Sequence, residues 1–547
     1  MIRADDLPVS WFDRPLYAPR VANASGDRWF LDAHPELASP GPDAAQLANA
    51  ARRGDRRALR DAFAMTYREW SLPKATAAAV AIDALVDGDA ACVVTGQQPG
   101  FLGGPYYTLY KALTAIAIAD RATERSGRRC VPVFWVAGED HDIDEVRTAR
   151  LRQPNGETAQ VSLPHAAERR PLSTLPISGV ADDALERARA LLATAPHAAD
   201  ALALVDLYRE RNVASGFAAI IASLLGEHGL VIIDPETLRA LARPLVRRLI
   251  EAPAGALERI EAGGDEFADR CGLRAFVRSR LPLFVLRDGR RDHLSPEADG
   301  LRVDGGDTRF TRRELLALLD AHPERFSSGA LLRPLVQQAT LPCALTVGGP
   351  AEVGYFAQLG PLARWLGVEP PAVSLRFHAT WLDRPALRAW RRLGIPIERL
   401  AESRDVEMLA TSAPRDADPL AELDELRARA VEIAEELATD FPGARKGIDR
   451  GARDIESSFD RLTERARKGR ARANEERFAA ATTLWNAIFP DGALEERRFA
   501  MISLVATHGR GGMRELLDVV RAALARDAAR GITVGPHRLL RAGDGNG

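Results

Sequence analysis

Four short, continuously apolar segments, separated by long helical stretches, constrain the fold of this chain most strongly. They are ACVVT (91–95), VPVFWVA (131–137), LVIID (230–234) and CALTV (343–347). A strand that is apolar at every position must be covered on both faces, and strands joined through helices pair in parallel. The sequence therefore predicts an α/β fold with a parallel sheet at its centre.

Other segments interrupt this pattern and predict insertions into the core. We expect a core over residues 1–410 that carries an N-terminal helical scaffold and two insertions, at about 165–225 and 245–330. The second insertion contains LPLFVLRDGRRDHL (281–294), whose Asp-Gly pair at 288–289 predicts a hairpin turn. No sequence repeat of fixed period is present.

A helical hairpin is predicted after the core, over residues 411–505. Apolar residues recur there at alternating spacings of three and four, before and after the break FPG (441–443), and charged residues flank them. This pattern indicates an antiparallel coiled coil. It serves either as an arm within one chain or as a dimerisation arm, and we favour the second because an isolated hairpin would leave much of its seam exposed. Residues 506–547 are expected to form a helix that returns to the core and a frayed tail.

Charge and composition exclude several classes of protein. The 547 residues contain 74 Lys and Arg against 76 Asp and Glu, a net charge of −2, which favours neither nucleic acid nor an anionic membrane as partner. No secretory signal pattern and no run of about 18 apolar residues is present, so we expect a cytoplasmic protein. The four cysteines lack CxxC spacing, which argues against a zinc site or a disulfide framework.

A glycine-rich turn, GQQPGFLGGP (96–105), follows the first strand. Glycine lets backbone N–H groups approach a ligand, proline suits the first position of a helix, and the start of a helix attracts anions. The apolar face of the following helix leaves Tyr107, Lys111 and Thr114 beside the core. We therefore expect Lys111 to reach a phosphate or carboxylate held by the loop, although a purely structural turn is the alternative.

An acid-histidine cluster, GEDHD (138–142), follows the second strand. Ligands of open α/β sheets bind at the carboxyl ends of the strands, where this cluster lies. We predict that Asp140 and Asp142 raise the pKa of His141 and fix its tautomer, which would make His141 a general base or acid near neutral pH. The alternatives are a solvated acidic loop and a divalent metal site. No second His or Cys lies within ligand spacing, so no metal is predicted.

A second glycine-proline turn, GGP (348–350), follows the last of the four strands and leads into a helix with Glu352 and Tyr355. Glutamate in a first helical turn is favourable through the helix dipole alone, so a structural explanation is available for it. Arg333 and Gln337 precede this strand and Arg376 follows it. Arginine suits bidentate contacts with carboxylate or phosphate, and we include these three residues in the predicted site.

Taken in order, five segments resemble the bacillithiol biosynthesis cysteine-adding enzyme family, also called the cysteine ligase family. They are TGQQPGFLGGPYYTLYK (95–111), PVFWVAGEDHDIDE (132–145), LLRPLVQQATLP (331–342), VGGPAEVGYFAQL (347–359) and FPDGALEERR (489–498). The resemblance spans about residues 10 to 540. It implies a Rossmann-like core related to class I nucleotidyltransferases, with two connecting insertions and an α-helical coiled-coil domain that forms a homodimer.

The resemblance also implies an activity, the addition of cysteine to glucosaminyl-malate in the last step of bacillithiol biosynthesis. The family's pocket motifs fall on Gly96, Gln97, Gln98, Pro105, Tyr107, Thr108, Lys111, Asp140, His141, Asp142, Gly348, Gly349, Glu352 and Tyr355. Among these we predict catalytic roles for Lys111, Asp140, His141 and Asp142. This chain departs from the family pattern at Tyr110, Gln338 and the block 495–497.

Amide formation in water needs an activated carboxylate, so ATP is the expected co-substrate. Neither of the sequence motifs HxGH and KMSKS, which class I synthetases use with ATP, is present. Two other functions fit the residues less well. One is a metal-assisted hydrolase or deacetylase of an amino-sugar, with Asp140, His141 and Asp144 as ligands, and the other is a non-catalytic nucleotide-binding dimer.

Overall fold

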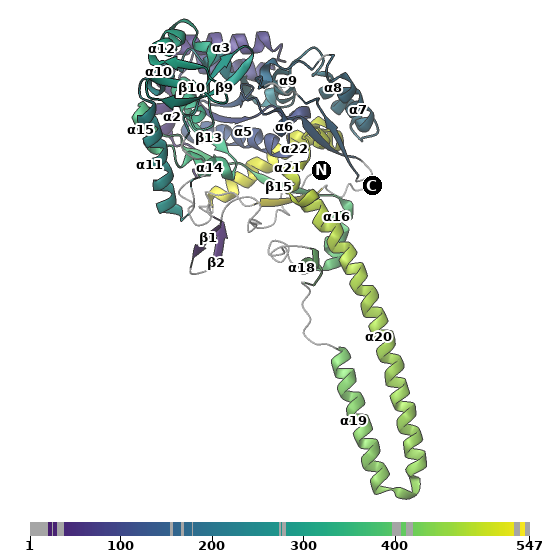
Figure 1. Cartoon of the computed structure of the whole chain (residues 1–547). Coiled ribbons are helices and arrows are strands. Elements are labelled where there is room, and N and C mark those ends of the chain that lie inside the picture. Colours follow the sequence, from purple (N-terminus) through teal and green to yellow (C-terminus); the bar gives the residue numbers. More distant parts are fainter. Residues whose placement is uncertain are drawn as a thin grey trace. The chain divides into compact units, whose positions relative to one another are not determined.

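A five-stranded parallel sheet forms the centre of the fold (Figure 1). The computed structural model describes residues 20–23, 26–29, 38–153, 157–165, 169–177, 179–272, 275, 280–395, 406–411, 419–529 and 537–541. The strands lie in the order β14 (Val373–Leu375), β13 (Cys343–Gly348), β3 (Ala91–Gln97), β4 (Cys130–Val136) and β7 (Val231–Ile233). All four neighbouring pairs are parallel. The predicted Rossmann-like α/β core is confirmed.

The order of the strands creates a switch point between β3 and β13. From β3 the chain winds outward through β4 and β7, and it then returns to the other side of β3 through β13 and β14. The connections therefore leave the sheet in opposite directions at β3 and β13. A crevice opens at the carboxyl ends of two such strands, and it is where ligands bind in open α/β sheets.

Helix α5 (Tyr106–Ser126) covers the middle of the sheet and packs on β3, β4 and β13. Its small and branched side chains join those of α2 (Ala44–Ala51) and the two central strands in one apolar cluster, which includes Ile118, Val93 and Leu345. Helix α5 is buried on most of its surface. Lys111 and Thr114, two polar residues that were expected beside the core, are buried as well. The glycine-rich turn thus leads directly into a helix that packs on three strands of the sheet.

Strand β4 is followed by an antiparallel pair and a group of helices. The pair is β5 (Thr148–Arg152) with β6 (Thr158–Ser162). The neighbouring elements in chain order are α6 (Ile143–Val146), η3 (Leu172–Thr174), α7 (Asp182–Leu192), α8 (Ala198–Asp206), α9 (Val213–Leu225) and η4 (Gly226–His228).

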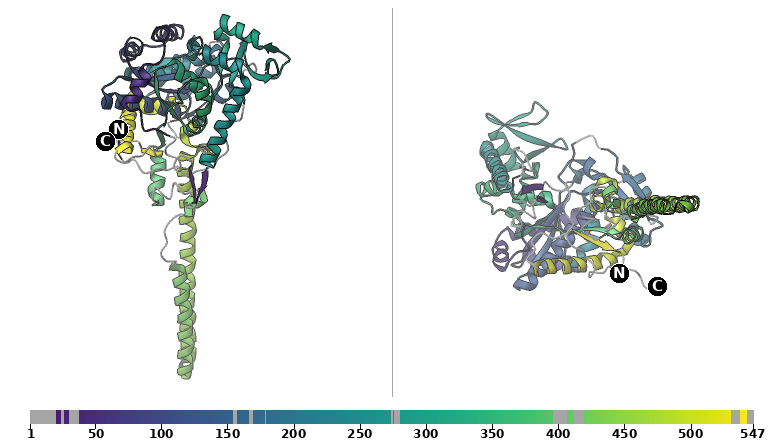
Figure 2. Two further views of the ribbon diagram at one scale, coloured as in Figure 1. Left: turned by 90° about the vertical axis from the view of Figure 1, so that its left-hand side faces the viewer. Right: turned by 90° about the horizontal axis from the view of Figure 1, so that it is seen from below.

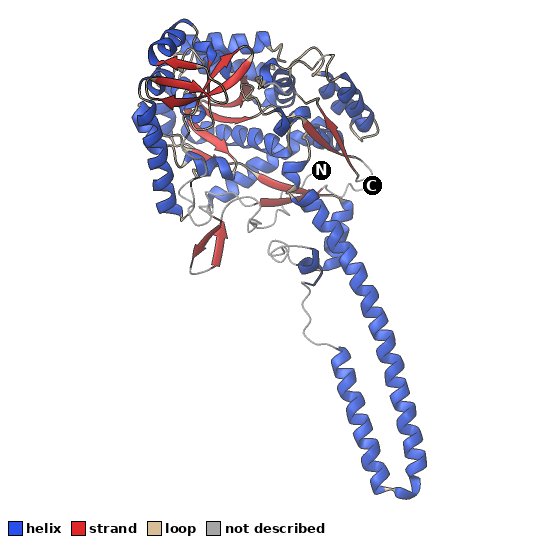
Figure 3. Cartoon of the chain, in the orientation of Figure 1, coloured by secondary structure: helices blue, strands red, loops and turns tan. Residues whose placement is uncertain are grey.

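A second five-stranded sheet lies between β7 and β13 in the chain, and it is antiparallel where its strands pair (Figure 3). Its order is β11 (Arg309–Thr311), β10 (Gly300–Val303), β9 (Arg290–Glu297), β8 (Leu283–Arg287) and β12 (Phe326–Ser328). Strands β8 and β9 form the predicted hairpin. Asp288 and Gly289 have φ values of 51° and 75° at its turn, as a type I′ turn requires.

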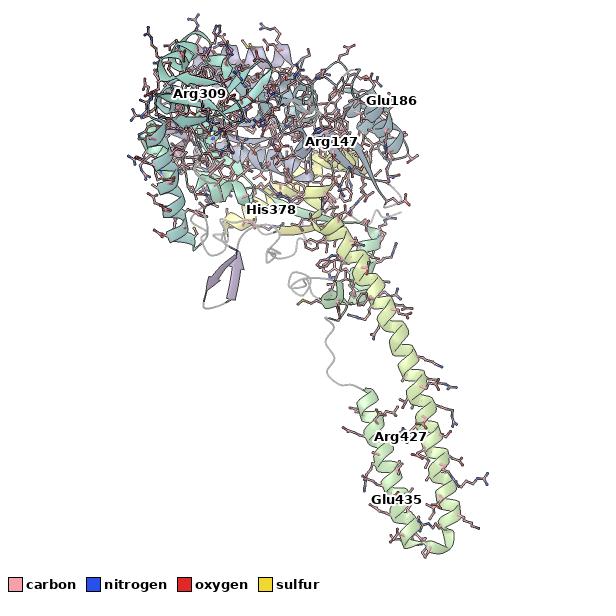
Figure 4. All side chains as sticks on the ribbon, viewed as in Figure 1. Arg147, Glu186, Arg309, His378, Arg427 and Glu435 are labelled. Atoms are coloured by element: carbon pink, nitrogen blue, oxygen red, sulfur yellow. The ribbon has the colours of Figure 1, made fainter. Side chains whose placement is uncertain are left out.

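By their contacts, the residues form two compact units: Met1–Thr380 with Ala493–Gly547, and Trp381–Gly492. The second unit contains α19 (Pro419–Asp440) and α20 (Arg445–Ile488), joined through η7 (Pro442–Ala444). These two helices run antiparallel alongside each other (Figure 1 and Figure 2). Arg427 on α19 pairs with Asp460 on α20 at 3.0 Å; Figure 4 labels the arginine.

The first unit is completed by the end of the chain. Helix α21 (Glu495–Arg498) contacts α5, and so does the long helix α22 (Ile502–Ala529). The expected frayed tail lies outside the described residues except for 537–541. None of the helices in the described part of the chain is long and apolar enough to cross a membrane.

The remaining elements complete the description. They are β1 (Arg20–Asn23), β2 (Gly26–Trp29), α3 (Arg56–Glu69), α4 (Thr76–Val86), η2 (Phe101–Gly103), η5 (Pro235–Leu238), α10 (Arg243–Glu251), α11 (Pro253–Cys271), α12 (Arg312–Ala321), η6 (Pro323–Arg325), α13 (Arg333–Thr340), α14 (Pro350–Phe356), α15 (Gly360–Leu366), β15 (His378–Leu382), α16 (Arg384–Leu393), α18 (Val406–Thr411), η8 (Pro490–Gly492) and β16 (His537–Arg541).

Candidate active site

A cavity of about 500 Å³ lies at the switch point, at the carboxyl ends of β3 and β13. Its lining comes from both glycine-proline turns, the acid-histidine loop and the start of α13. The lining residues are Gly96, Gln97, Gln98, Tyr107, Lys111, Asp140, Glu145, Ala330, Arg333, Gly349, Pro350, Ala351, Glu352, Tyr355, Arg376 and Arg497. The motifs that were predicted to meet at this edge of the sheet therefore do surround one cavity.

The glycine-rich turn is closed so tightly that two of its glycines leave no room for a side chain. A Cβ atom on Gly100 would lie 2.5 Å from the Cα of Gly104, and one on Gly96 would lie 2.7 Å from the carbonyl oxygen of Trp135. Gly104 has a φ of 70°, a conformation that glycine adopts without strain. These contacts fix the path of the loop that forms one wall of the cavity.

Pro105 occupies a different position from the one predicted. It is the residue before the first turn of α5, with an extended ψ of 158°, whereas it was expected to be the first helical residue. The reason is tertiary, because Pro105 forms an isolated antiparallel bridge with Ala500. In the other turn the prediction holds, since Pro350 is the first residue of α14 and the N–H of Gly349 donates to Glu352 at 2.8 Å.

Lys111 forms a buried ion pair with Glu352. Its Nζ lies 2.5 Å from Oε2 of Glu352, and it also donates to the carbonyl of Gly96 at 3.0 Å and to Oε1 of Gln97 at 2.9 Å. Burial lowers the pKa of Lys111, and Glu352 opposes that change. Burial alone would raise the pKa of Glu352, but Lys111 and the N–H of Gly349 hold it below its usual range. The three ammonium protons are thus used within the protein, and Lys111 is not an uncommitted anion ligand as expected.

Arg333 is a cation at the cavity that has no carboxylate within ion-pair distance in the described part of the chain. Its Nη2 donates to the hydroxyl of Tyr355 at 3.2 Å. Arg376, by contrast, pairs bidentately with Glu496, at 2.9 Å from Nη1 and 2.7 Å from Nη2. The arrangement makes Arg333 the group best placed to receive an anionic ligand.

The acidic residues of the GEDHD cluster have different surroundings. Glu139 is buried and accepts hydrogen bonds from the hydroxyls of Ser327 at 2.9 Å and Ser328 at 3.0 Å. Asp140 lines the cavity and accepts a hydrogen bond from Nε2 of Gln98 at 2.7 Å. Burial would raise the pKa of Asp140, but Arg291 and this hydrogen bond hold it below its usual range. Asp142 is exposed and does not line the cavity.

His141 contacts Arg291, a residue of the antiparallel sheet. Nη1 of Arg291 lies 3.1 Å from Nδ1 of His141 and 3.4 Å from Oδ1 of Asp140. Arginine keeps its protons, so it is the donor, and Nδ1 of a neutral His141 is the acceptor. The ring proton is then on Nε2.

The predicted rise in the pKa of His141 is wrong. Burial and the charge of Arg291 lower this pKa, and they outweigh Asp140 and Asp142. Because the proton of the neutral ring is on Nε2, His141 presents a hydrogen-bond donor on that side. The geometry therefore argues against its expected role as a general base. Arg291 itself was missed, because it lies about 150 residues away in an insertion.

The other predicted residues do not line the main cavity, and His141 is one of them. Thr108 and Gly348 are buried in the walls, and Pro105 lines a second cavity. Gln337 lines a small side pocket. Glu145 and Arg497 line the main cavity and were not predicted as site residues. Glu145 follows the GEDHD block by three positions, and Arg497 belongs to the late block FPDGALEERR, so both carried a sequence signal.

The second cavity, of about 600 Å³, adjoins the first. The two cavities share Gln97, Gln98, Tyr107, Glu145 and Arg497. The ring of Tyr107 lies near two guanidinium groups, with its centre 5.4 Å from that of Arg376 and 5.6 Å from that of Arg497. Burial raises the pKa of Tyr107, so its hydroxyl stays protonated at neutral pH. The second cavity is also lined by Arg150, Gln160 and Arg498.

No group of three or more His, Cys, Asp or Glu side chains is placed to hold a metal ion among the residues that the structure describes. Asp144, which the hydrolase hypothesis named as a ligand, is exposed and lies 3.0 Å from Nδ1 of His165. Its surroundings differ from those of Asp140, which faces the cavity.

Comparison with known proteins gives a consistent result. Residues 38–377 match the family model described as "Bacillithiol biosynthesis BshC, N-terminal Rossmann-like domain". A protein of Salinibacter ruber named "Putative cysteine ligase BshC" is 31% identical over 516 residues, which cover 91% of this chain and 92% of that protein. Proteins of the same name from Symbiobacterium thermophilum and Koribacter versatilis are each 30% identical; the matches cover 78% and 82% of this chain and 81% and 83% of theirs.

Proposed function

Because the chain belongs to the BshC family of bacillithiol biosynthesis, we propose that it is a cysteine ligase. It joins the carboxyl group of L-cysteine to the amine of glucosaminyl-malate and forms an amide. The observation that supports this reaction best is the pairing of charges at the switch-point cavity. Arg333 has no carboxylate partner in the described residues, and the carboxylate of Glu352 lines the same cavity. An α-amino acid carries the two complementary charges.

The carboxylate of cysteine must be activated before an amine can displace one of its oxygens. ATP would supply this activation by making that oxygen part of a leaving group. Arg333 holds and orients the carboxylate, and residues of the two glycine-rich turns line the same cavity. The site thus offers an anion-binding wall without the HxGH and KMSKS motifs of class I synthetases.

Three further residues position these groups. Lys111 ties Glu352 to the carbonyl of Gly96, which keeps both turns in place. His141 does not line the cavity, but its backbone N–H donates to Oδ1 of Asp140 at 2.8 Å and holds that carboxylate in place, a positioning role instead of the base role expected from sequence. The proton lost by the attacking amine goes to a carboxylate of the cavity, and Asp140 is placed for this because it lines the cavity.

The adjoining cavity is the proposed site of glucosaminyl-malate. Its lining includes Arg150 and Arg498, which suit the two carboxylates of a malate group. Tyr107 and Gln97 line both cavities, so an amine held in the second one can reach a carboxyl group held in the first.

We also propose that the protein is a cytoplasmic homodimer. Cys92, Cys130 and Cys343 are buried thiols of the parallel sheet, as suits a reducing compartment. The helical hairpin exposes large apolar side chains, among them Leu426, which is 61% exposed, and Leu462, which is 53% exposed. A second copy of the hairpin would cover them.

The test of the ligase function uses purified protein with glucosaminyl-malate and cysteine, with and without ATP, and detects the product by mass spectrometry. We expect product only with ATP. Absence of product under both conditions would contradict the proposal, and product without ATP would contradict the role of ATP.

The variant Arg333→Gln tests the site itself. We expect it to raise the KM for cysteine by about 10- to 100-fold, because a charge-assisted contact contributes about 1.5–3 kcal/mol. Arg364→Gln, at an exposed position of α15, is the matched control and should behave like the wild type. An unchanged KM in Arg333→Gln would contradict the assignment of Arg333.

A further inference from the structure

A small side pocket adjoins the main cavity at Arg333 and Glu352. Its volume is about 10 Å³, which is room for the centre of one water-sized group. The side pocket shares Gly96, Gln97, Arg333 and Glu352 with the main cavity. Its other lining residues are Trp135, Ala137, Gln337, Thr346, Val347 and Phe356.

Two of these residues bring unused hydrogen-bonding atoms to the pocket. Trp135 is 1% exposed and Gln337 is 4% exposed. Among the described residues, neither Nε1 of Trp135 nor Oε1 of Gln337 has a hydrogen-bond partner. Buried polar atoms are nearly always paired, so two in one small pocket indicate that a ligand group supplies the partner. One is a donor and the other is an acceptor.

The remaining walls limit the chemistry of that group. Ala137, Val347 and Phe356 are apolar and buried. The group must therefore be small, able to donate one hydrogen bond and accept one, and otherwise compatible with an apolar surface. A thiol meets these conditions, because it donates and accepts weak hydrogen bonds and is more polarisable and less strongly hydrated than a hydroxyl.

The mouth of the side pocket carries the charges that an amino acid needs. Arg333 and Glu352 line both the side pocket and the main cavity, and they bear opposite charges. The contacts of the Glu352 carboxylate within the described residues use Oε2, which leaves Oε1 for an ammonium group. A zwitterion bound between these two residues would direct its side chain into the pocket.

We infer that this side pocket holds the side chain of the cysteine substrate, with its thiol between Nε1 of Trp135 and Oε1 of Gln337. The inference rests on the proposed ligase function, and it assigns selection of the amino acid to these two residues. Serine makes the same contacts with a smaller group that loses more hydration. 2-Aminobutyrate places a methyl group where the thiol lies and makes no hydrogen bond, and valine is too wide for the pocket.

The test compares cysteine with 2-aminobutyrate in wild-type protein, Trp135→Phe and Gln337→Met, with ATP and glucosaminyl-malate present. Each variant removes one hydrogen bond and keeps most of the side-chain volume. We expect the ratio of kcat/KM for cysteine to that for 2-aminobutyrate to fall about five- to tenfold in each variant, with the KM for glucosaminyl-malate unchanged. Trp365→Phe, on α15, is the matched control and should leave the ratio unchanged.

A pocket that holds only a structural water gives a different result. Both variants would then melt at a lower temperature with an unchanged ratio, and this outcome would overturn the inference. Calorimetric titration of cysteine into each folded variant, without ATP, separates the inference from the proposed function. If the variants form product and the ratio of kcat/KM values is unchanged, the inference about the side pocket is contradicted and the ligase function is not. If the protein has no ligase activity but binds cysteine, and this binding weakens in both variants, the ligase function is contradicted and the side-pocket inference is not. If the protein does not bind cysteine at all, both are contradicted.

Discussion

At the scale of single residues, most charges near the cavity are already neutralised by the protein. Lys111 uses its three protons on Glu352, Gly96 and Gln97, and Arg376 is held by Glu496. The ammonium of Lys111 therefore has no proton left for a substrate, whereas the carboxylate of its partner Glu352 keeps Oε1 for one. The residues that bind substrate are therefore better sought among uncommitted groups, such as Arg333, than among the most buried charges.

The variant Lys111→Met tests this view of the ion pair. It leaves the carboxylate of Glu352 partly buried without its counter-charge, and we expect the free energy of unfolding to fall by about 3–5 kcal/mol. Chemical denaturation measures this change. The double variant Lys111→Met with Glu352→Gln should recover part of the loss, because no uncompensated charge remains. Unchanged stability in the single variant, combined with lost activity, would instead make Lys111 a ligand-binding group.

His378 predicts a pH dependence of stability. Burial, with the nearby Arg376, lowers its pKa to about 4, whereas the unfolded chain has the ordinary value of 6.5. Between these values the unfolded chain binds more protons than the folded one, so the free energy of unfolding falls as the pH falls from 6.5 to 4. This group contributes at most about 3 kcal/mol to that fall.

The variant His378→Gln checks the assignment, because glutamine does not titrate. Its free energy of unfolding should depend less on pH than that of the wild type between pH 7 and pH 4. Chemical denaturation of both proteins at several pH values gives the comparison. Parallel curves for the two proteins would show that His378 does not carry the effect.

The sequence predicted the residues of the site that directly follow a strand or begin a helix. Gly96, Asp140 and Gly349 reach the cavity because the parallel sheet brings the ends of its strands together. The pKa of His141 was mispredicted because its two neighbouring aspartates are visible in the sequence, whereas the burial of its ring and the charge of Arg291 are not. A contact across about 150 residues leaves no local pattern, so its effect on charge could not be anticipated.

At the scale of elements, four of the five strands of the parallel sheet were predicted, because they are short and apolar throughout. The fifth, β14, has only three residues and was not predicted. The turn at Asp288 and Gly289 was predictable for a similar local reason. The position of Pro105 was not, because its extended backbone depends on a bridge to Ala500, nearly 400 residues later. Local signals thus identified elements, and tertiary contacts set their ends.

Helix α11 offers a test of close packing between elements. A Cβ atom on Gly263 would lie 2.0 Å from the carbonyl oxygen of Gln358, whereas one on Gly255 in the same helix would lie 3.5 Å from the ring of Trp365. We expect Gly263→Ala to lower the free energy of unfolding by about 1–3 kcal/mol. Gly255→Ala is the control and should leave stability unchanged or raise it by up to about 1 kcal/mol. Thermal denaturation of both variants measures the difference, and equal effects would contradict the packing argument.

At the scale of the whole molecule, the exposed apolar side chains of the hairpin predict self-association. Ile455 and Leu462 of α20 line a surface hollow of about 370 Å³ and are 49% and 53% exposed. We expect the wild type to sediment as a dimer and the double variant Ile455→Glu, Leu462→Glu as a monomer, because the variant replaces the apolar surface that would be buried between two copies with charged side chains. Circular dichroism should show unchanged helix content in the variant. A monomeric wild type would contradict the dimer.

The first unit is discontinuous, since it consists of Met1–Thr380 and Ala493–Gly547. Its buried pair of Arg376 and Glu496 joins the two pieces. During translation, the ribosome therefore releases all five strands of the parallel sheet more than a hundred residues before the partner of Arg376 is made. The site stays incomplete until residues 493–498 are made, so we expect a chain that stops before Ala493 to lack the partner of Arg376 and to be inactive.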